Sequence, residues 1–293
     1  MSSIDLHIHT IYSDGQHTVS EILRKSEEVG LSTISITDHD TVDAYEELEK
    51  TEVRSLFSGK IIPGIEISFN LDGRLFDVLG YDIDITIMKK LLNNRMSRKQ
   101  QKQMQVELLE EFKNVCKKNE ISFNKSLTIK NGTKSEAFNI LFTDISNFDK
   151  HPENKVYEEY ISIDNRANFY KNFFTNPKSK FYVNEAKYLP SLQEAIEMIH
   201  KCGGNVFLAH AFAYGLDDPF DFINFAVQNG IDGLEMYYPS FTEEQSNIIK
   251  NIAKVNNLYV SGGSDFHGDL IKKNHLIGKP YISSSLIEPW AFF

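Results

Sequence analysis

The sequence predicts an α/β fold in which strands alternate with helices to form a parallel sheet. Short β-favouring apolar runs are followed by segments with helical caps, both near the start of the chain and after residue 190. Five of the runs lead into His or carboxylate residues, at positions 5–9, 37–40, 64–66, 208–210 and 263–267. Such side chains converge only if the strands lie side by side, as in a barrel with its chemistry at the carboxyl ends of its strands.

Length and composition limit the classes of protein that fit. The 293 residues, 41% hydrophobic and 25% charged, suit one large domain or one domain with an insertion. The net charge of −10 argues against binding of long duplex nucleic acid over a broad surface. Cys116 and Cys202 lack a CxxC spacing, and no apolar run reaches membrane-spanning length. Since a strand is expected by about Ile4, we expect no signal peptide, no membrane partner and a cytoplasmic location.

The amino-terminal part predicts strands at 4–8, 33–37 and 75–81, with a further apolar run at 60–63 leading to Glu66. Thr18 and Glu21 have the spacing of a capping box, so a helix is expected from there to about Val29, ended by Gly30. A second helix is expected at 42–50, and we interpret Asp40 as its N-cap.

The middle of the chain differs from both ends. Residues 86–118 suit one long helix, and residues 119–188 are polar, aromatic and irregular. We therefore expect residues 85–189 to be an inserted, mainly helical subdomain that covers the substrate, and residues 1–84 with 190–293 to form the metal-binding barrel. After the insertion, a capping-box spacing at Ser191 and Glu194 opens a renewed alternation of helices and strands. Its helices are expected from Ser191 to Gly203, at 219–228 and at 242–255, and its strands at 206–209, 233–236 and 259–262.

The His and carboxylate residues predict a metal site. His7 and His9 are two apart on a strand, so they lie on one face. A lone buried His is more often a hydrogen-bonded core residue, but this pair together with Glu66 and Asp265 indicates ligands. Asp38 is a candidate hydrogen-bond partner for an imidazole.

These segments resemble the motifs of the polymerase and histidinol phosphatase (PHP) superfamily, in its stand-alone phosphoesterase branch. The resemblance rests on residues 5–10, 37–40, 63–66 and 263–268, and covers about 1–84 and 190–293. It implies a distorted barrel of seven strand–helix units, a (β/α)7 TIM-like fold, with two to three divalent ions. The implied ligands are His7, His9, Asp14, His39, Glu66, Asp77, His210, Asp265 and His267.

Carried over from the family, the roles of these residues separate into three metal positions. His7, His9, Glu66 and Asp265 would hold the first ion, and Glu66 would bridge to a second ion that His210 also binds. Asp14, His39 and His267 would hold the third, although His267 could instead reach the first or second. Glu66, His210, Asp265 and His267 are thereby the expected catalytic residues.

Asp77 departs from the family, which usually has His at this position. A carboxylate can replace an imidazole as a ligand, with an innocent strand residue as the alternative. The replacement makes the site harder and more anionic, so Mn or Fe is favoured and Zn remains an option. It also leaves open whether the second ion is fully bound.

The expected reaction is hydrolysis of a phosphoester by a metal-bound hydroxide. The positive charge of three divalent ions would exceed the negative charge of Asp14, Glu66, Asp77 and Asp265. The surplus would balance a phosphate group and a hydroxide. No Ser or Cys nucleophile is required, and Cys202 is interpreted as a buried core thiol. The expected substrate is a small phosphorylated molecule, such as a nucleoside 3′,5′-bisphosphate or a short oligonucleotide.

Substrate-binding residues are less clearly marked. The branch has a basic residue after a Gly in its insertion, and Lys134 after Gly132 is the nearest match. Arg166 and His17 are further candidates for phosphate contacts, with exposure to solvent as the ordinary alternative. Lys171 is a weaker candidate from the insertion. Tyr237 and Tyr238 could stack on a base or pack within the barrel. His151, His200 and His275 lack a motif and are expected to be structural or exposed.

Three rival functions remain open. A histidinol-phosphate phosphatase would carry more basic residues around its motifs. A non-catalytic PHP module would have degenerate ligands, whereas here only Asp77 departs. Processive nuclease action on long nucleic acid conflicts with the acidic balance, because such enzymes need a basic track for the phosphates.

Overall fold

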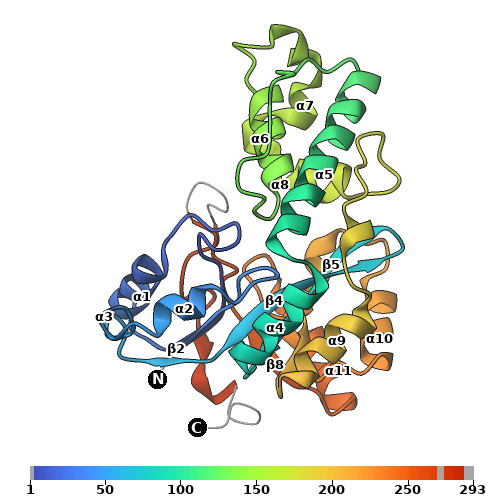
Figure 1. Cartoon of the computed structure of the whole chain (residues 1–293). Coiled ribbons are helices and arrows are strands. Elements are labelled where there is room, and N and C mark those ends of the chain that lie inside the picture. The colour runs from blue at the N-terminus through green and yellow to red at the C-terminus, as the bar shows by residue number, and fades with distance from the viewer. Residues whose placement is uncertain (1–2, 269–273, 287–293) are drawn as a thin grey trace. The chain divides into compact units, whose positions relative to one another are not determined.

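The computed structural model describes residues 3–268 and 274–286, which divide into two compact units (Figure 1). Unit 1 takes the described residues of 1–69, 76–92 and 190–293, and unit 2 those of 70–75 and 93–189. The function of the insertion as a substrate cover stays a prediction.

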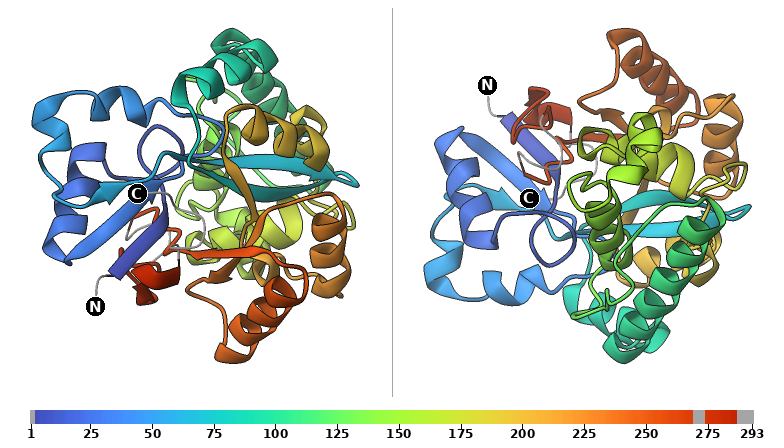
Figure 2. Two further views of the ribbon diagram at one scale, coloured as in Figure 1. Left: turned by 90° about the horizontal axis from the view of Figure 1, so that it is seen from below. Right: turned by 90° about the horizontal axis from the view of Figure 1, so that it is seen from above.

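Unit 1 is built on two sheets (Figure 2), one in the order β3-β2-β1-β9 and the other in the order β4-β5-β6-β7-β8. The strands are β1 (Ser3–Ile8), β2 (Leu31–Ile36), β3 (Lys60–Ile61), β4 (Gly64–Leu71), β5 (Arg74–Tyr81), β6 (Asn205–Leu208), β7 (Gly233–Tyr237), β8 (Tyr259–Gly262) and β9 (Ile282–Ser283). Buried side chains of β1, β5 and β6, among them Leu6, Leu79 and Phe207, form one apolar core.

The expectation of a wholly parallel sheet is wrong. The pairs β1–β2, β2–β3, β6–β7 and β7–β8 are parallel, but β5 runs antiparallel to β6 and β9 antiparallel to β1. Isolated parallel bridges join Ile8 to Phe266 and His39 to Glu66, so the end of β1 lies beside the loop after β8, and the loop after β2 lies beside β4. The α/β class is confirmed, while closure into a seven-unit barrel stays a prediction.

The helices of unit 1 begin where capping signals occur. Thr18 with Glu21, Ser191 with Glu194 and Thr242 with Gln245 each form a complete capping box. The helices are α1 (Val19–Glu28), α2 (Ala44–Leu48), α3 (Thr51–Arg54), α9 (Leu192–Lys201), α10 (Pro219–Gln228) and α11 (Glu243–Val255). Helix α1 packs on β2, α9 on β6 and α11 on β7, which holds the strand ends in place.

Two helix predictions need correction. Residues 42–50 form the short α2 and are followed by the separate α3, and Asp40 does not cap α2. Asp40 has a positive φ of 53°, and its carboxylate accepts a hydrogen bond from the backbone N–H of Ser68. The expected long helix at 86–118 is two helices, α4 (Ile85–Arg95) and α5 (Arg98–Lys118), because Ser97 and Gln100 form a capping box that starts a new helix.

Unit 2 is helical around an aromatic core. Besides α5 it contains α6 (Glu136–Ile145), α7 (Glu158–Ile161), α8 (Arg166–Phe169) and the short helical turns η1 (Pro152–Tyr157), η2 (Ile163–Asn165), η3 (Tyr170–Phe174) and η4 (Ala186–Tyr188). Phe112 and Phe174 lie 4.8 Å apart between ring centroids, and Phe138 and Phe142 lie 5.2 Å apart. Burial of these large rings is what stabilises a unit that has so little regular sheet.

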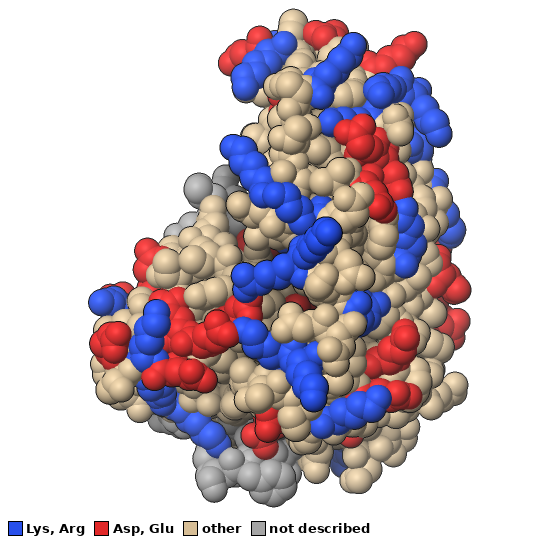
Figure 3. Space-filling view, in the orientation of Figure 1, with Lys and Arg blue, Asp and Glu red and all other residues tan. Residues whose placement is uncertain are grey.

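The cysteine side chains, the surface charges and the helix lengths bear on expectations drawn from the composition. Cys116 and Cys202 are both buried and unbridged, as expected of packed thiols. The face drawn in Figure 3 carries both basic and acidic side chains. Across the residues that the structure describes, no helix has the length and apolar character to cross a membrane.

Candidate metal centre

Nine predicted ligands come from six strands or the loops that follow them, and all nine lie in unit 1. His7 is in β1, Glu66 in β4 and Asp77 in β5, and the rest follow β1, β2, β6 and β8. Asp77 lies within a strand as expected, whereas Glu66, expected after the apolar run at 60–63, lies within the separate strand β4. The structure brings together three groups whose ligand atoms lie within 4.8 Å of one another: His9, Asp14, His39 and His267; His7, His9, Glu66 and Asp265; and His39, Glu66 and Asp77.

Glu66 is the residue around which most of these imidazoles gather. Its Oε2 atom lies 3.1 Å from Nε2 of both His7 and His9, and 3.3 Å from Nδ1 of His39. Its Oε1 atom lies 3.0 Å from Nε2 of His210, which stands outside the three groups. One carboxylate therefore faces imidazoles on both of its oxygens, as a bridging ligand would.

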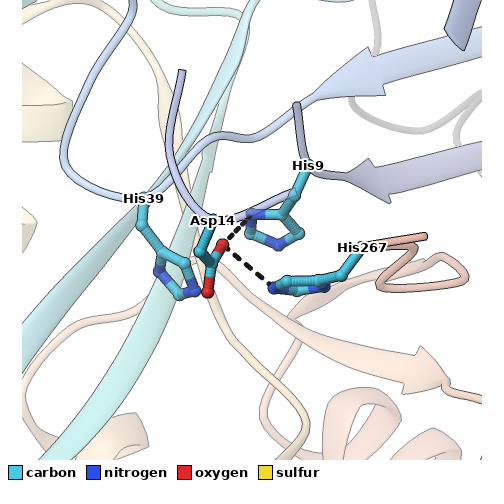
Figure 4. A group of neighbouring side chains, drawn as sticks. All are labelled: His9, Asp14, His39 and His267. Atoms are coloured by element: carbon cyan, nitrogen blue, oxygen red, sulfur yellow. Dashed lines mark ion pairs between the residues drawn. The ribbon is translucent and has the colours of Figure 1, made fainter. Parts of the chain in front are cut away.

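Two further carboxylates complete the cluster. Asp265 Oδ1 lies 3.3 Å from His9 Nε2 and 3.2 Å from His267 Nδ1. Asp14 Oδ1 lies 3.1 Å from His267 Nε2 and 3.8 Å from His9 Nδ1 (Figure 4). His9 thus presents one nitrogen toward Glu66 and Asp265 and the other toward Asp14.

The backbone is strained where it presents ligands. His210 and Asp265 have positive φ values of 29° and 51°, which non-glycine residues seldom adopt. Such conformations persist only where the surrounding structure enforces them, and they concentrate at functional sites. At Gly263, a Cβ atom would lie 2.4 Å from the backbone nitrogen of His7, so only glycine lets the end of β8 approach β1 this closely.

The buried charges shift one another's proton affinity. Burial opposes charging of His9, but Asp265, Glu66 and Asp14 raise its pKa to about 9. Burial likewise disfavours the charged form of Glu66, yet His39, His7 and His210 hold its pKa well below the usual range. The pKa of Asp14 is also lowered, against its burial, by His267, His39 and His9. The protonated imidazoles and the carboxylates of the cluster therefore stabilise one another's charges.

The donor set fits divalent cations. Among the described residues, both ring nitrogens of His9, Nδ1 of His210 and Oδ1 of Asp14 are buried and make no hydrogen bond of good geometry, although His9 Nε2 and Asp14 Oδ1 lie close to charged neighbours. Buried polar atoms normally have partners, so buried nitrogens and oxygens that face one another without hydrogen bonds fit the donor set of a cation site. Imidazole and carboxylate groups are suitable ligands for Mn, Fe and Zn.

Asp77 lies at the edge of this cluster and is held by hydrogen bonds. Its Oδ1 accepts from the Ser68 hydroxyl, and its Oδ2 accepts from the Tyr214 hydroxyl at 3.2 Å. Oδ1 also lies 3.9 Å from Nδ1 of His39. The position is compatible with a ligand for an ion shared with Glu66.

Two residues near the candidate ligands, Glu235 and Tyr214, were not assigned a role from the sequence, and Tyr238 makes a hydrogen bond that was not expected. Glu235 accepts from His7 Nδ1 at 2.9 Å, Tyr238 donates to Asp265 Oδ2 at 2.7 Å, and Tyr214 donates to Asp77. Glu235 lies within β7, Tyr214 ends the turn that follows β6, and Tyr238 follows β7; for Glu235 and Tyr214 this position was the only sequence signal. Asp38 has a different role from the predicted one, since its oxygens accept from Thr10 and Ser13 and hold the loop that carries Asp14.

The aromatic and histidine alternatives are largely decided by burial. Tyr238 is buried, and its hydroxyl is bonded to Asp265, so packing describes it better than base stacking. Tyr237 is half-buried and packs against the core of unit 1. His151 bonds to Asp144 and His200 to Asp232, and neither histidine belongs to the three groups. His275, which was expected to be structural or exposed, is half-buried, and its Nδ1 lies 3.9 Å from Asp265 Oδ2.

The predicted substrate residues lie in both units. His17, in unit 1, stacks on Phe266 and has Nδ1 3.7 Å from Glu21 Oε2. Lys134, with the weaker candidate Lys171, and Arg166 lie in unit 2. Arg166 bonds to Asn139 and lies over the Phe138 ring. In the loop before Lys134, the backbone N–H groups of 130–133 donate to the carboxylate of Glu136.

Comparison with known proteins identifies the class. A family model described as PHP domain matches residues 5–261, so the chain belongs to the PHP domain family, and the predicted resemblance is confirmed. The chain is a hydrolase of the metal-dependent phosphoesterase class.

The individual relatives share between 23% and 27% of aligned residues with this chain. The chain is 27% identical over 267 residues to a 5′-3′ exoribonuclease of Haemophilus influenzae, covering 90% of this chain and 89% of the relative. It is 23% identical over 277 residues to a phosphoribosyl 1,2-cyclic phosphate 1,2-diphosphodiesterase of Eggerthella lenta, covering 93% and 97%. A Bifidobacterium adolescentis structure described as a metal-dependent phosphoesterase superposes with a TM-score of 0.68 at 24% identity, covering 98% of this chain and 94% of that one. This last likeness shows the fold.

Proposed function

We propose that this protein hydrolyses a phosphoester of a nucleotide, either a nucleoside 3′,5′-bisphosphate or a short single-stranded oligonucleotide. The observation that carries the proposal is the cluster in which Glu66 contacts four imidazoles while Asp265 and Asp14 close its other side. Nucleotide chemistry is favoured because one relative is named an exoribonuclease.

Two to three divalent ions would be held by the nine candidate ligands, with Mn or Fe favoured and Zn as an option. We assign His7, His9, Glu66 and Asp265 to the first and Asp14, His39 and His267 to the third. The second would be held by Glu66, His210 and Asp77. Divalent cations at such a site lower the pKa of bound water and offset the charge of a phosphate.

The residues of the chain have their own parts in this proposal. Glu66, His210, Asp265 and His267 would orient the reacting groups, since each is buried and contacts a side chain from another segment of the chain. Burial excludes bulk water, which strengthens every charge interaction within the cluster. Lys134, Arg166 and His17 are proposed to bind substrate phosphate. Because Glu136 already accepts the N–H groups of the loop at 130–133, a phosphate bound there would depend on side chains such as Lys134.

The test is phosphate release by the Mn-loaded protein from adenosine 3′,5′-bisphosphate, with Asp265→Ala as the blank. A 5′-phosphorylated trinucleotide is assayed in parallel for mononucleotide release. Release from either substrate that disappears in the variant supports the proposal. A metal-loaded protein that cleaves neither, but hydrolyses histidinol phosphate or a cyclic phosphate of ribose, would exclude the nucleotide assignment.

A further inference from the structure

Glu235 is a buried carboxylate that contacts two of the ligand residues without belonging to any of the three groups. It lies in β7 and is 1% exposed. Its Oε1 atom lies 2.9 Å from Nδ1 of His7, and its Oε2 atom accepts a hydrogen bond of 2.7 Å from the backbone N–H of His210. Both oxygens are therefore committed to residues that come from other strands.

The first contact decides which nitrogen of His7 can bind a cation. An imidazole whose Nδ1–H donates to a carboxylate carries its lone pair on Nε2. In His7, Nε2 is the atom that faces the cluster, 3.1 Å from Glu66 Oε2 and 3.5 Å from Asp265 Oδ1. The orientation of the ring and the site of its proton thus both depend on Glu235.

The second contact acts on the backbone that presents His210. This residue has a φ of 29°, outside the usual regions, and it starts the turn η5 (Ala211–Tyr214) after β6. A hydrogen bond to a buried carboxylate is strong enough to offset part of the cost of such a conformation. The His210 imidazole then faces Glu66 Oε1.

We propose that Glu235 is a positioning residue that fixes His7 as an Nε2 ligand and holds His210 toward Glu66, so that one carboxylate sets ligands for two metal positions. The inference rests on the proposed metal-dependent function, although metal binding alone tests it. Removal of such an outer carboxylate typically weakens metal affinity by about 10- to 100-fold.

The other end of the same strand offers a matched control. Asp232, just before β7, also binds a histidine and a backbone N–H of β6: its Oδ2 atom lies 2.7 Å from His200 Nε2 and accepts from Val206 N at 2.8 Å. Asp232→Asn therefore disturbs a carboxylate–histidine contact and a β6–β7 link, as Glu235→Gln does, but outside the ligand cluster.

The experiment is a competition titration of the metal-free full-length protein with Zn²⁺ against a chromogenic chelator. Glu235→Gln should bind the ion about 10- to 100-fold more weakly, and Asp232→Asn should bind it as the wild type does. Unchanged affinity in Glu235→Gln overturns the proposal, and so does equal weakening in both variants, which would indicate general loosening of β7. Wild-type protein that binds zinc but cleaves no nucleotide would count against the proposed function and leave this test intact.

A second measurement covers the case in which Glu235→Gln does not fold. Nitrogen-15 NMR of histidine-labelled, Zn²⁺-loaded wild-type protein reports the protonated and the coordinated nitrogen of each ring. For His7, the expected result is a protonated Nδ1 and a coordinated Nε2. Coordination through Nδ1 would refute the inference without any substitution.

Discussion

Glu66 and His210 are 144 positions apart in the chain, yet Nε2 of His210 lies 3.0 Å from Oε1 of Glu66. The other oxygen of Glu66 faces His7, His9 and His39. One buried carboxylate therefore links residues from β1, β2 and β6. A change at Glu66 should consequently affect more than one metal position.

The isosteric substitution Glu66→Gln is expected to lower the number of ions bound and to abolish most activity. The amide removes the negative charge and replaces one acceptor with a donor, so ions on both sides of it lose a ligand. The loss of metal affinity should exceed the factor of about 10 to 100 that is typical when an outer carboxylate is removed. Metal content by mass spectrometry and phosphate release provide the measurements, and Glu28→Gln, at an exposed position, is the control. Full metal content in Glu66→Gln would show that Glu66 is not a bridging ligand.

The metal-free protein is expected to become less stable as the pH rises above neutrality. The pKa of His9 is raised from 6.5 to about 9, and that of His7 is also raised, by Glu66, Glu235 and Asp265 against the effect of burial. Because the pKa of His9 is higher in the folded state, its protonation stabilises the folded protein, and this stabilisation is complete below pH 6.5. The stabilisation is lost as the pH rises through about 9.

Thermal unfolding of chelator-treated protein from pH 6.5 to above 9 measures this effect. The melting temperature should fall over that range, and Zn²⁺ should reduce the fall because coordination uses neutral imidazoles. His9→Asn provides the comparison, since it removes one of the titrating groups. A melting temperature that does not change with pH in the metal-free protein would contradict the raised pKa values.

Asp77 should control which ion the second position prefers. Asp77→His restores the usual family residue and is expected to shift preference from Mn toward Zn, because imidazole is a softer ligand than carboxylate. Asp77→Asn should lower occupancy without that shift. Competition between Mn²⁺ and Zn²⁺ measures the preference, with Tyr214→Phe as the control that removes only the hydroxyl bonded to Asp77. Identical preferences in all the proteins would make Asp77 a structural residue.

Lys134→Ala and Arg166→Ala are expected to raise KM for a nucleoside 3′,5′-bisphosphate with little change in kcat. A residue that binds the non-reacting phosphate contributes equally to the ground state and the transition state. A nucleoside monophosphate should show a smaller rise, and Lys125→Ala, at an exposed position of unit 2, is the control. Because Arg166 also contacts Asn139 and Phe138, the melting temperature of the Arg166→Ala variant is measured as well. Loss of stability with an unchanged KM would assign Arg166 a structural role.

Local signals in the sequence predicted much of the framework. The capping boxes at Thr18, Ser191 and Thr242 each start a helix where expected, because a cap depends on residues three positions apart. The same rule, applied at Ser97 and Gln100, would have divided the expected long helix. The antiparallel pairing of β5 with β6 was not predictable in this way, since strand direction depends on partners that are distant in sequence.

The sequence by itself determined the ligand types, their family and the class of reaction, since His, Asp and Glu at these motifs suit only a few kinds of site. The tertiary structure alone decided that Glu66 faces four imidazoles and that Asp38 binds Thr10 and Ser13. It also decided that Glu235, Tyr214 and Tyr238 hydrogen-bond to His7, Asp77 and Asp265. The physical reason is the sequence separation between the interacting residues. Ligand identity and helix caps are local properties of the chain, whereas a buried hydrogen bond between strands exists only after packing has brought its two partners together and excluded water from both.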